Sequence, residues 1–152
     1  MAQLAFIKEV AMDADSMKTL VRRYYDELWG QGRLGFIDEA IAEPYENCDP
    51  ATPGNVVRGR EGLRALVGGY RESFPDIRFE IVEQFVDGNV VTSRWRVSGT
   101  HRGALMGIPP SGRRVENLEG ITLSTFEGSK ILRDRVVWDT LGLLRQLGAV
   151  PG

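Results

Sequence analysis

The hydrophobic residues of this chain change their spacing once, near the sequence FPD at 74–76. Before this point apolar side chains recur at the three- and four-residue intervals of amphipathic helices. After it they alternate every second residue, as they do in half-buried strands. Helices followed by strands exclude the repeated strand–helix–strand units that build a parallel sheet. The order predicts an α+β protein in which helices cover one face of a curved, mainly antiparallel sheet.

Three helices are predicted ahead of the change, at 14–30, 35–43 and 60–74. Pro44 ends the second helix, because a proline disfavours helical backbone in the residue before it. The sequence ENCDPATPGN at 46–55 is rich in proline, glycine, asparagine and aspartate. Such a composition is typical of turns, so we predict an irregular connection between the second and third helices.

Four strands and a short helix are predicted after the change. The helix lies at 139–148, and a long loop rich in glycine and proline lies at 101–114. A twisted sheet capped by helices leaves a pocket between the two layers, and we expect a ligand to bind there. The strands are expected from Ile77 to the hairpin turn DGN (87–89) and at 89–99, 116–127 and 131–139.

The last strand carries one carboxylate in apolar surroundings. Alternation places Leu132, Asp134, Val136 and Trp138 on one face of this strand. Arg133 and Arg135 lie on the other face, where we expect a dimer contact. Asp134 is therefore either an acid working in an apolar pocket or one end of an ion pair with an arginine such as Arg94 or Arg96. Ion pairing lowers a carboxyl pKa and apolar burial raises it, so the pKa separates the two hypotheses.

Composition restricts the partners. The net charge is −2, from 19 Lys and Arg against 21 Asp and Glu, which disfavours nucleic acid and anionic membranes. A single cysteine, Cys48, leaves no intrachain disulfide and fits a reducing cytoplasm. With His101 as the only histidine, no metal site is expected.

Residues 1–13 lack a long apolar segment and are predicted to be a flexible arm before a single domain at 14–152.

Three sequence strings carry a family resemblance: FPD at 74–76, GTHRGALMGIPPSGRR at 99–114 and WDTLGLLRQLG at 138–148. Together with the order of elements, they resemble the SnoaL-like polyketide cyclases of the nuclear transport factor 2-like superfamily. The resemblance implies a cone-shaped barrel, in which a strongly curved mixed sheet wraps around three N-terminal helices and a short helix follows. It also implies a homodimer through the outer sheet face and an enzyme without a cofactor.

Cyclases of this family close a ring by intramolecular aldol condensation, with an aspartate on the last strand as acid and base. Counting back from LRQLG, that aspartate falls on Val136. A histidine that some cyclases carry falls on Thr122, and a neighbouring glutamine falls on Gly120. Asp134 remains as the candidate proton-transfer group, one pleat away on the same face. Burial in an apolar pocket lets such a carboxyl group both accept and donate a proton.

Three functions stay open at this stage. The first is a cofactor-independent cyclase acting on a polyketide or a similar aromatic rich in carbonyl groups. The second is a cofactor-independent hydroxylase or isomerase that uses the same pocket, which Val136 favours over the aldol reaction. The third is a binding protein whose pocket has lost its acid.

Further candidate residues each have a structural alternative. Asp49 either contacts the substrate or caps the turn before Pro50. His101 is either a base at the pocket mouth or a pin for its loop. Asp139 is expected to cap the last helix. For a small aromatic, polyketide-like ligand the expected contacts are Tyr25, Trp29, Trp95, Met106, Thr122, Val136 and Trp138.

Overall fold

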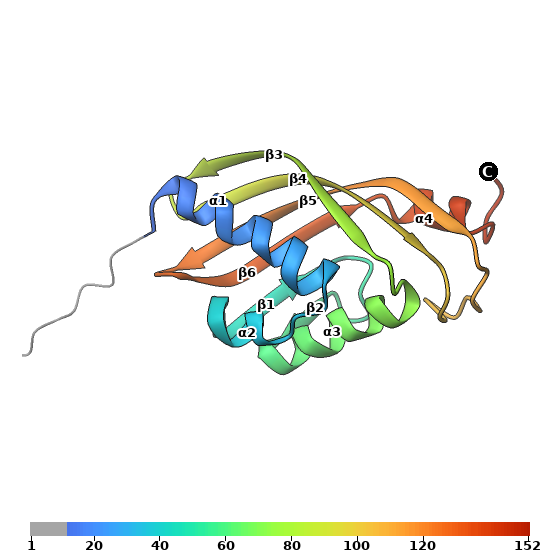
Figure 1. Ribbon diagram of the computed structural model, residues 1–152, viewed down its shortest axis with the longest axis horizontal. Coiled ribbons are helices and arrows are strands. Elements are labelled where there is room, and N and C mark those ends of the chain that lie inside the picture. The colour runs from blue at the N-terminus through green and yellow to red at the C-terminus, as the bar shows by residue number, and fades with distance from the viewer. Residues whose placement is uncertain (1–11) are drawn as a thin grey trace, which may run out of the picture.

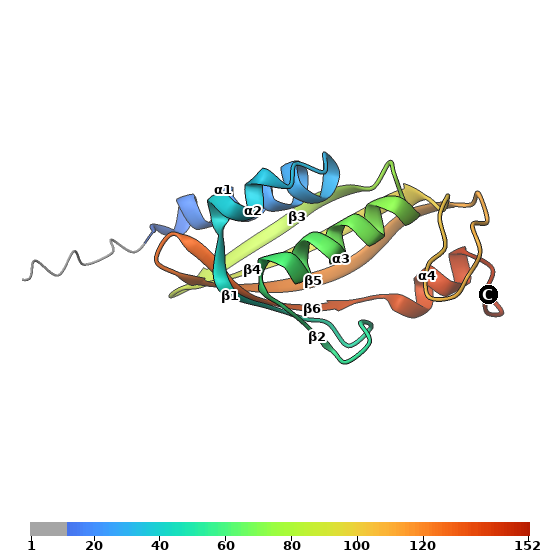
Figure 2. The same cartoon turned by 90° about the horizontal axis from the view of Figure 1, so that it is seen from below.

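The computed structural model describes residues 12–152 (Figure 1). Helices lie on one face of a sheet, and a last short helix lies beyond the end of the sheet (Figure 2). The helical elements are α1 (Ala14–Arg23), η1 (Tyr24–Gly30), α2 (Gly35–Ala40), α3 (Gly59–Ser73) and α4 (Thr140–Gln146). The strands are β1 (Ile41–Cys48), β2 (Val56–Arg58), β3 (Arg78–Asp87), β4 (Val90–Thr100), β5 (Arg114–Glu127) and β6 (Lys130–Trp138). Most of the predicted arm at 1–13 lies outside the described residues.

The first predicted helix is confirmed as α1 and its continuation η1, a π-helical segment. Asp13 caps it by accepting a hydrogen bond of 2.7 Å from the backbone nitrogen of Ser16, which satisfies a donor that has no partner inside the helix. The predicted apolar stripe is buried from Met17 to Leu28. In η1 the wider turn presents both Tyr24 and Tyr25 to the interior, and both rings become part of the site.

The prediction of a helix at 35–43 and a turn at 46–55 was partly wrong. The helix ends at Ala40, and the chain continues as β1, which pairs with β2 on one side and β6 on the other. Pro44 lies at a register shift in the β1–β6 ladder, where a missing N–H breaks no regular hydrogen bond. Tyr45, Asn47 and Asp49 alternate inward along this segment.

The six strands lie in the order β2-β1-β6-β5-β4-β3. β1 and β6 run parallel, and the other neighbouring pairs are antiparallel. The prediction of a strongly curved, cone-shaped barrel is wrong, because the sheet stays open and the helices lie on one face of it (Figure 2). The three-residue strand β2 and the strand β3 are the two edges of the sheet and do not pair with each other.

The last strand follows the predicted alternation with one exception. Asp134 is fully buried, Val136 and Trp138 are half-buried on the same side, and Val137 is 66% exposed. Opposite Thr125 and Phe126 the register of β6 jumps from Arg133 to Ile131, so Leu132 is an extra residue in a bulge. Ile131, rather than the predicted Leu132, therefore takes the core position below Asp134.

Candidate active site

A pocket lies between the helices and the inner face of the sheet. The space between its walls, including the part open to solvent, is about 730 Å³, within the range of small-molecule sites. Its polar side chains besides the tyrosines are Asn47, Asp49 and Ser98. Aromatic rings form a large part of the wall: Tyr24, Tyr25, Trp29, Tyr70, Phe74, Phe79, Trp95 and Trp138. Such walls favour a planar, apolar ligand.

Asp49 is the one carboxylate among the residues that line this pocket within the described chain. It follows β1 and is 8% exposed. One carboxylate oxygen accepts a hydrogen bond of 2.8 Å from the backbone nitrogen of Ala51, and the other accepts one of 3.0 Å from the indole nitrogen of Trp138. Asp49 therefore caps its turn, which was one of the two predicted roles, and its side chain also lines the pocket. Contact with a substrate stays a prediction.

Tyr70 of α3 lines the same pocket as this carboxylate. Burial raises the pKa of the Tyr70 hydroxyl to about 12, and the negative charge of Asp49 adds to the increase. A tyrosine with so high a pKa keeps its proton at neutral pH. Tyr70 therefore adds a hydrogen-bond donor to a largely apolar wall.

The positions of the expected family acid and histidine face the pocket layer but carry no titratable group. Val136 lines the pocket, and Thr122 lies opposite it on β5. Thr122 is fully buried, and its hydroxyl bonds the Tyr25 hydroxyl at 2.6 Å and the Trp95 indole nitrogen at 2.9 Å. Thr122 thus positions two rings of the pocket wall, and it is not itself among the lining residues.

Gly120 makes room for Trp95. A Cβ atom added at Gly120 would lie 2.3 Å from atoms of the Trp95 ring, far inside van der Waals contact. The Trp95 ring therefore occupies the space into which a longer side chain at position 120 would project. This chain fills the region with an aromatic surface.

Asp134 does not reach the pocket surface. It is fully buried and accepts hydrogen bonds from the hydroxyls of Tyr45, at 2.5 Å, and Ser124, at 2.6 Å. Burial raises the pKa of Asp134, and the surrounding hydroxyls of Ser124, Tyr45 and Tyr24 oppose the increase without cancelling it. Asp134 takes part in none of the ion pairs between described residues. The raised pKa fits the hypothesis of an acid in apolar surroundings rather than that of an ion pair.

The arginines considered as its partners lie elsewhere. Arg94 pairs with Glu83 and Glu119, and Arg96 also pairs with Glu119. All four side chains are at least partly exposed, so these pairs are worth little to stability.

Tyr45, Asn47 and Tyr24 were not singled out from the sequence. The Tyr24 and Tyr45 hydroxyls lie 3.4 Å apart, and the amide nitrogen of Asn47 donates to the Tyr45 hydroxyl at 3.2 Å. The segment containing Tyr45 and Asn47 was expected to be helix and turn. Its inward alternation, Tyr45, Asn47 and Asp49, is the signal that would have identified a strand.

His101 is fully buried and pins its loop. Its Nδ1 lies 2.9 Å from the Ser111 hydroxyl and accepts a hydrogen bond from the Ser111 backbone nitrogen at 3.2 Å. Its ring packs beside Phe74, at 5.5 Å between centroids. His101 is not among the lining residues of the pocket. A catalytic role for it stays a prediction, and the contacts themselves hold the 101–114 loop closed on itself.

Met106 lies in that same loop and is 45% exposed. It borders a shallower hollow, with Leu105 from the loop and Thr52 from the turn after β1. Leu66 and Tyr70 of α3 line both the hollow and the main pocket. The loop and this turn therefore flank the approach to the main pocket along α3.

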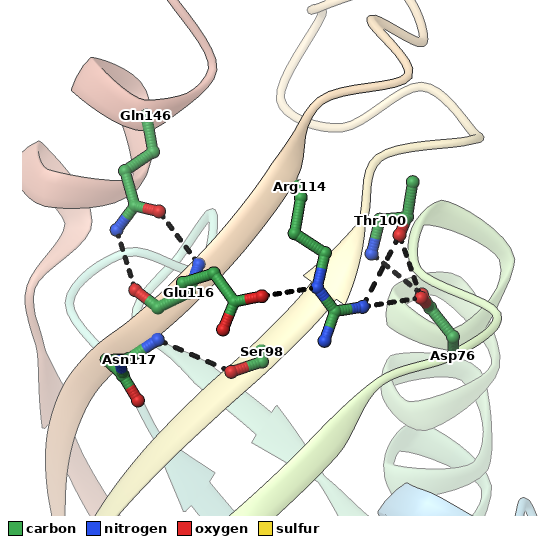
Figure 3. Close-up of polar contacts among 7 residues, drawn as sticks. All are labelled: Asp76, Ser98, Thr100, Arg114, Glu116, Asn117 and Gln146. Carbon is green, nitrogen blue, oxygen red and sulfur yellow. Dashed lines mark hydrogen bonds and ion pairs between the residues drawn. The ribbon is translucent and has the colours of Figure 1, made fainter.

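The three sequence strings used above meet at one end of the sheet (Figure 3). Asp76 accepts hydrogen bonds from the backbone nitrogen and hydroxyl of Thr100 at 2.7 and 2.8 Å, and it pairs with Arg114 at 2.9 Å. Gln146 of α4 bonds the backbone nitrogen and oxygen of Glu116. Burial raises the pKa of Asp76, but the Thr100 bonds and the Arg114 charge bring it below its ordinary value. These motifs hold strand ends, loop and α4 together.

The described residues contain no group of three His, Cys, Asp or Glu side chains that could hold a metal ion. Over residues 12–152, no helix is both long and apolar enough to cross a membrane.

The arrangement defines a class: an α+β protein with the nuclear transport factor 2-like fold and an aromatic pocket between its helices and sheet. The model of the SnoaL-like polyketide cyclases matches residues 19–147, and the chain belongs to this family. It is 34% identical to the aklanonic acid methyl ester cyclase DnrD of Streptomyces peucetius over 131 residues, 85% of this chain and 88% of the relative. DauD of Streptomyces sp. strain C5, a cyclase of the same name, is 33% identical over 85% and 80%.

Solved structures agree with this assignment. TsrD from Streptomyces laurentii superposes with a TM-score of 0.80 at 28% identity, covering 91% of this chain and 99% of TsrD. A SnoaL-like polyketide cyclase from Agrobacterium tumefaciens C58 superposes with a TM-score of 0.71 at 26% identity, covering 87% and 98%.

Proposed function

We propose that this protein is a cofactor-independent enzyme that closes a ring in a polyketide-like aromatic by intramolecular aldol chemistry, with Asp49 as the group that moves the proton. The observation that carries the proposal is one carboxylate, the only one that residues 12–152 place in the pocket wall, held by Trp138 and Ala51 among aromatic rings. Family membership and the names of the curated relatives supply the reaction class.

The chemistry needs one proton to move twice. The Asp49 carboxylate removes a proton from a carbon beside a substrate carbonyl, and the electron pair of that C–H bond becomes an enolate. The enolate carbon attacks a second carbonyl of the same molecule, which forms the new carbon–carbon bond and leaves an alkoxide. The alkoxide then takes back a proton, so substrate and product are isomers and no cofactor is consumed. The pocket contributes by holding the two ends of the substrate together.

This assignment differs from the sequence-based preference for Asp134. Asp134 lies behind the pocket wall and cannot touch a carbon atom of a ligand without a rearrangement of Tyr24 or Tyr45. Asp49 faces the pocket directly. Both carboxylate oxygens of Asp49 already accept a hydrogen bond, which fixes the orientation of the group.

A second candidate function rests on Val136. This residue lines the pocket at the position where the family resemblance expects the catalytic aspartate, so the chain is alternatively a binding protein for the same class of ligand. A hydroxylase or isomerase reaction would use the same pocket. Val136 favours them over ring closure by the family's own aspartate, whereas Asp49 supplies the carboxylate that ring closure needs.

The test compares Asp49→Asn with wild type, using aklanonic acid methyl ester as the first substrate and product analysis as the readout. Asparagine keeps the shape of the side chain and can still accept the hydrogen bond from Ala51. Its amide nitrogen cannot accept the one from Trp138, and the group cannot take up a proton, so product formation should fall by about 10²–10⁴-fold. Asp139→Asn is the matched control, because it changes the exposed cap of α4, where asparagine caps equally well. Binding without product in wild type would favour the binding protein. Full activity in Asp49→Asn would rule out the role of Asp49.

The proposal includes a homodimer through the outer face of the sheet. Phe85 of β3, Ile121 and Leu123 of β5 and Val137 of β6 form an exposed apolar patch on that face. Arg135 lies in the same region and is exposed. Ile121 and Val137 are paired neighbours, and Thr92 of β4 separates Phe85 from Leu123. Exposed apolar side chains gathered on one face favour an interaction site. A cytoplasmic location remains part of the proposal, on the basis of the single cysteine.

A further inference from the structure

A chain of hydroxyl groups connects the pocket wall to a buried carboxyl group. We propose that Tyr24, Tyr45 and Asp134 form a hydrogen-bond relay in which Tyr24 donates to the carbonyl oxygen of the bound substrate, and in which the proton on Asp134 sets the direction of the chain. Tyr24 would be a catalytic residue because it touches the reacting carbonyl, and Tyr45 and Asp134 would position it. This inference rests on the proposed function, since it assigns the donor for the enolate oxygen that Asp49 creates.

The contacts run without interruption from strand to pocket. Asp134 of β6 accepts from Tyr45 of β1 at 2.5 Å, and the Tyr45 hydroxyl lies 3.4 Å from that of Tyr24 in η1. Tyr24 and Asn47 are the members of this network that also line the pocket. The 3.4 Å separation is longer than an ordinary hydroxyl hydrogen bond. Catalytic hydrogen bonds are often long without substrate and shorten when it binds.

The direction of the chain follows from counting protons, because each hydroxyl has only one. When Asp134 is a carboxylate, Tyr45 must donate to it, and the Tyr24 proton then turns toward Tyr45 and away from the pocket. When Asp134 is neutral, its own proton can be donated to the Tyr45 oxygen. Tyr45 then donates to Tyr24, and the Tyr24 proton is free to point at a ligand. The second lone pair of Tyr45 accepts from Asn47 in either case.

The surroundings of Asp134 favour the neutral form. Desolvation raises its pKa, and the titratable groups that face it are the tyrosines of η1 and β1, whose own pKa values burial raises well above the ordinary value. Ser124 of β5, which also faces it, does not titrate near neutral pH. Of its neighbours on β6, Arg133 is half-buried and Arg135 is exposed, and neither forms an ion pair with it. A carboxylic acid kept neutral in this way is an established means of supplying a hydrogen bond to an enolate oxygen.

The test uses a probe that neither titrates nor reacts: 9-fluorenone, a planar three-ring ketone. The infrared carbonyl stretch of the bound probe moves to lower wavenumber when it accepts a hydrogen bond, so the readout needs no turnover. We expect a lowered band with wild type and loss of that shift with Tyr24→Phe. The matched control is Tyr25→Phe, which removes the hydroxyl of the adjacent ring, whose partner is Thr122. Tyr25→Phe should keep the lowered band even if it alters the affinity.

The dependence on pH tests the role of Asp134. In wild type the lowered band should be lost as the pH rises through the ionisation of Asp134. In Asp134→Asn the amide stands in for the neutral acid, donating to Tyr45 and accepting from Ser124, so the lowered band should persist at every pH. Near-ultraviolet circular dichroism checks the fold of each variant. If Asp134→Asn does not fold, Tyr45→Phe cuts the chain instead and should also give a band independent of pH.

Each outcome separates the two proposals. A lowered band that Tyr24→Phe leaves unchanged overturns the relay but leaves the pocket and Asp49 in place. Suppose instead that Tyr24→Phe removes the lowered band, but wild type and Asp134→Asn show the same dependence of the band on pH. That result overturns the part assigned to Asp134. Failure of 9-fluorenone to bind wild type counts against a pocket for aromatic carbonyl compounds, and so against the proposed function and the relay together.

Discussion

The indole nitrogen of Trp138 donates a hydrogen bond of 3.0 Å to the carboxylate of Asp49. The contact joins the end of β6 to the turn after β1, two segments that are neighbours only because β1 and β6 run parallel. Because Ala51 holds the other carboxylate oxygen, neither oxygen can turn away from the pocket without losing a bond. Trp138 thus serves as pocket wall and as a positioning group for Asp49.

Replacing Trp138 with phenylalanine separates these two roles. The ring surface largely remains, and the hydrogen bond to Asp49 is lost. A hydrogen bond to a charged group contributes about 1.5–3 kcal/mol, so kcat should fall by about tenfold or more while KM changes less. Steady-state kinetics on the ring-closing reaction measures both. A rise in KM alone would show that Trp138 acts only as pocket wall.

The substitution Asp134→Asn should change how folding stability depends on pH. Burial raises the pKa of Asp134 above its ordinary value of 3.8, so the folded chain keeps this proton over a range in which the unfolded chain has lost it. The stabilising contribution of the neutral acid is therefore full below pH 3.8 and is lost as the pH rises through the folded pKa. Asparagine has no such proton. The free energy of unfolding of Asp134→Asn, relative to wild type, should rise across this window in urea denaturation. A difference that stays flat would contradict a raised pKa.

Two glycine substitutions should have opposite effects. A Cβ atom at Gly120 would overlap the Trp95 ring, which is buried and hydrogen-bonded to Thr122. Gly120→Ala should therefore destabilise the fold by about 1–3 kcal/mol. Gly68 lies within α3, and a Cβ atom there would meet nothing within 4 Å. Gly68→Ala should stabilise by about 0.5–1 kcal/mol. Thermal denaturation of both variants measures the contrast, and equal effects would mean that the Trp95 ring can move aside.

The sequence predicted the elements whose spacing is regular. The stripe from Met17 to Leu28 and the alternation of Asp134, Val136 and Trp138 follow directly from the helix and strand periods, and the structure confirms the faces they share. The strand β1 was missed because GFIDEAIAEPY combines a short helical pattern with a proline. Only pairing with β2 and β6, which are distant in sequence, makes that segment a strand. Tertiary contacts decide such segments, and local propensity does not.

The sequence placed the site only in part. Trp29, Tyr25, Trp95 and Val136 line the pocket as expected, whereas Met106 borders a separate hollow and Thr122 lies behind the wall. The Tyr45–Asp134 contact joins residues 89 positions apart, and no local pattern reports such a distance. The motifs that carry the family resemblance were informative about the fold because Asp76, Arg114 and Gln146 hold the end of the sheet (Figure 3). Because these three residues hold the fold together and do not line the pocket, they say little about the chemistry.

The outer face of the sheet predicts a change in assembly. Val137 is 66% exposed and lies beside Ile121, its partner on β5, in the apolar patch. A charge at the centre of a buried interface is costly, so Val137→Lys should convert a dimer into a monomer. Size-exclusion chromatography with light scattering measures the mass. Glu72→Lys on α3, which is exposed on the helical side, is the control and should leave the mass unchanged. A Val137→Lys dimer would place the interface elsewhere.

The final prediction concerns the missing acid of the family. Val136 lines the pocket, opposite Thr122 on β5, so Val136→Asp puts a carboxyl group where the family resemblance expects one. If this pocket holds a substrate for ring closure, the new carboxyl group can move the proton that Asp49 no longer moves. The double variant Asp49→Asn, Val136→Asp should therefore recover part of the product formation lost in Asp49→Asn.

The comparison is made at equal protein concentration, and Val136→Asn in the same background is the control, because it has similar size and polarity but cannot transfer the proton. Recovery with asparagine as well as aspartate would mean that polarity at this position, rather than proton transfer, restores turnover. No recovery with either, from a double variant that still binds the substrate, would mean that the reacting carbon lies near Asp49 and out of reach of β6.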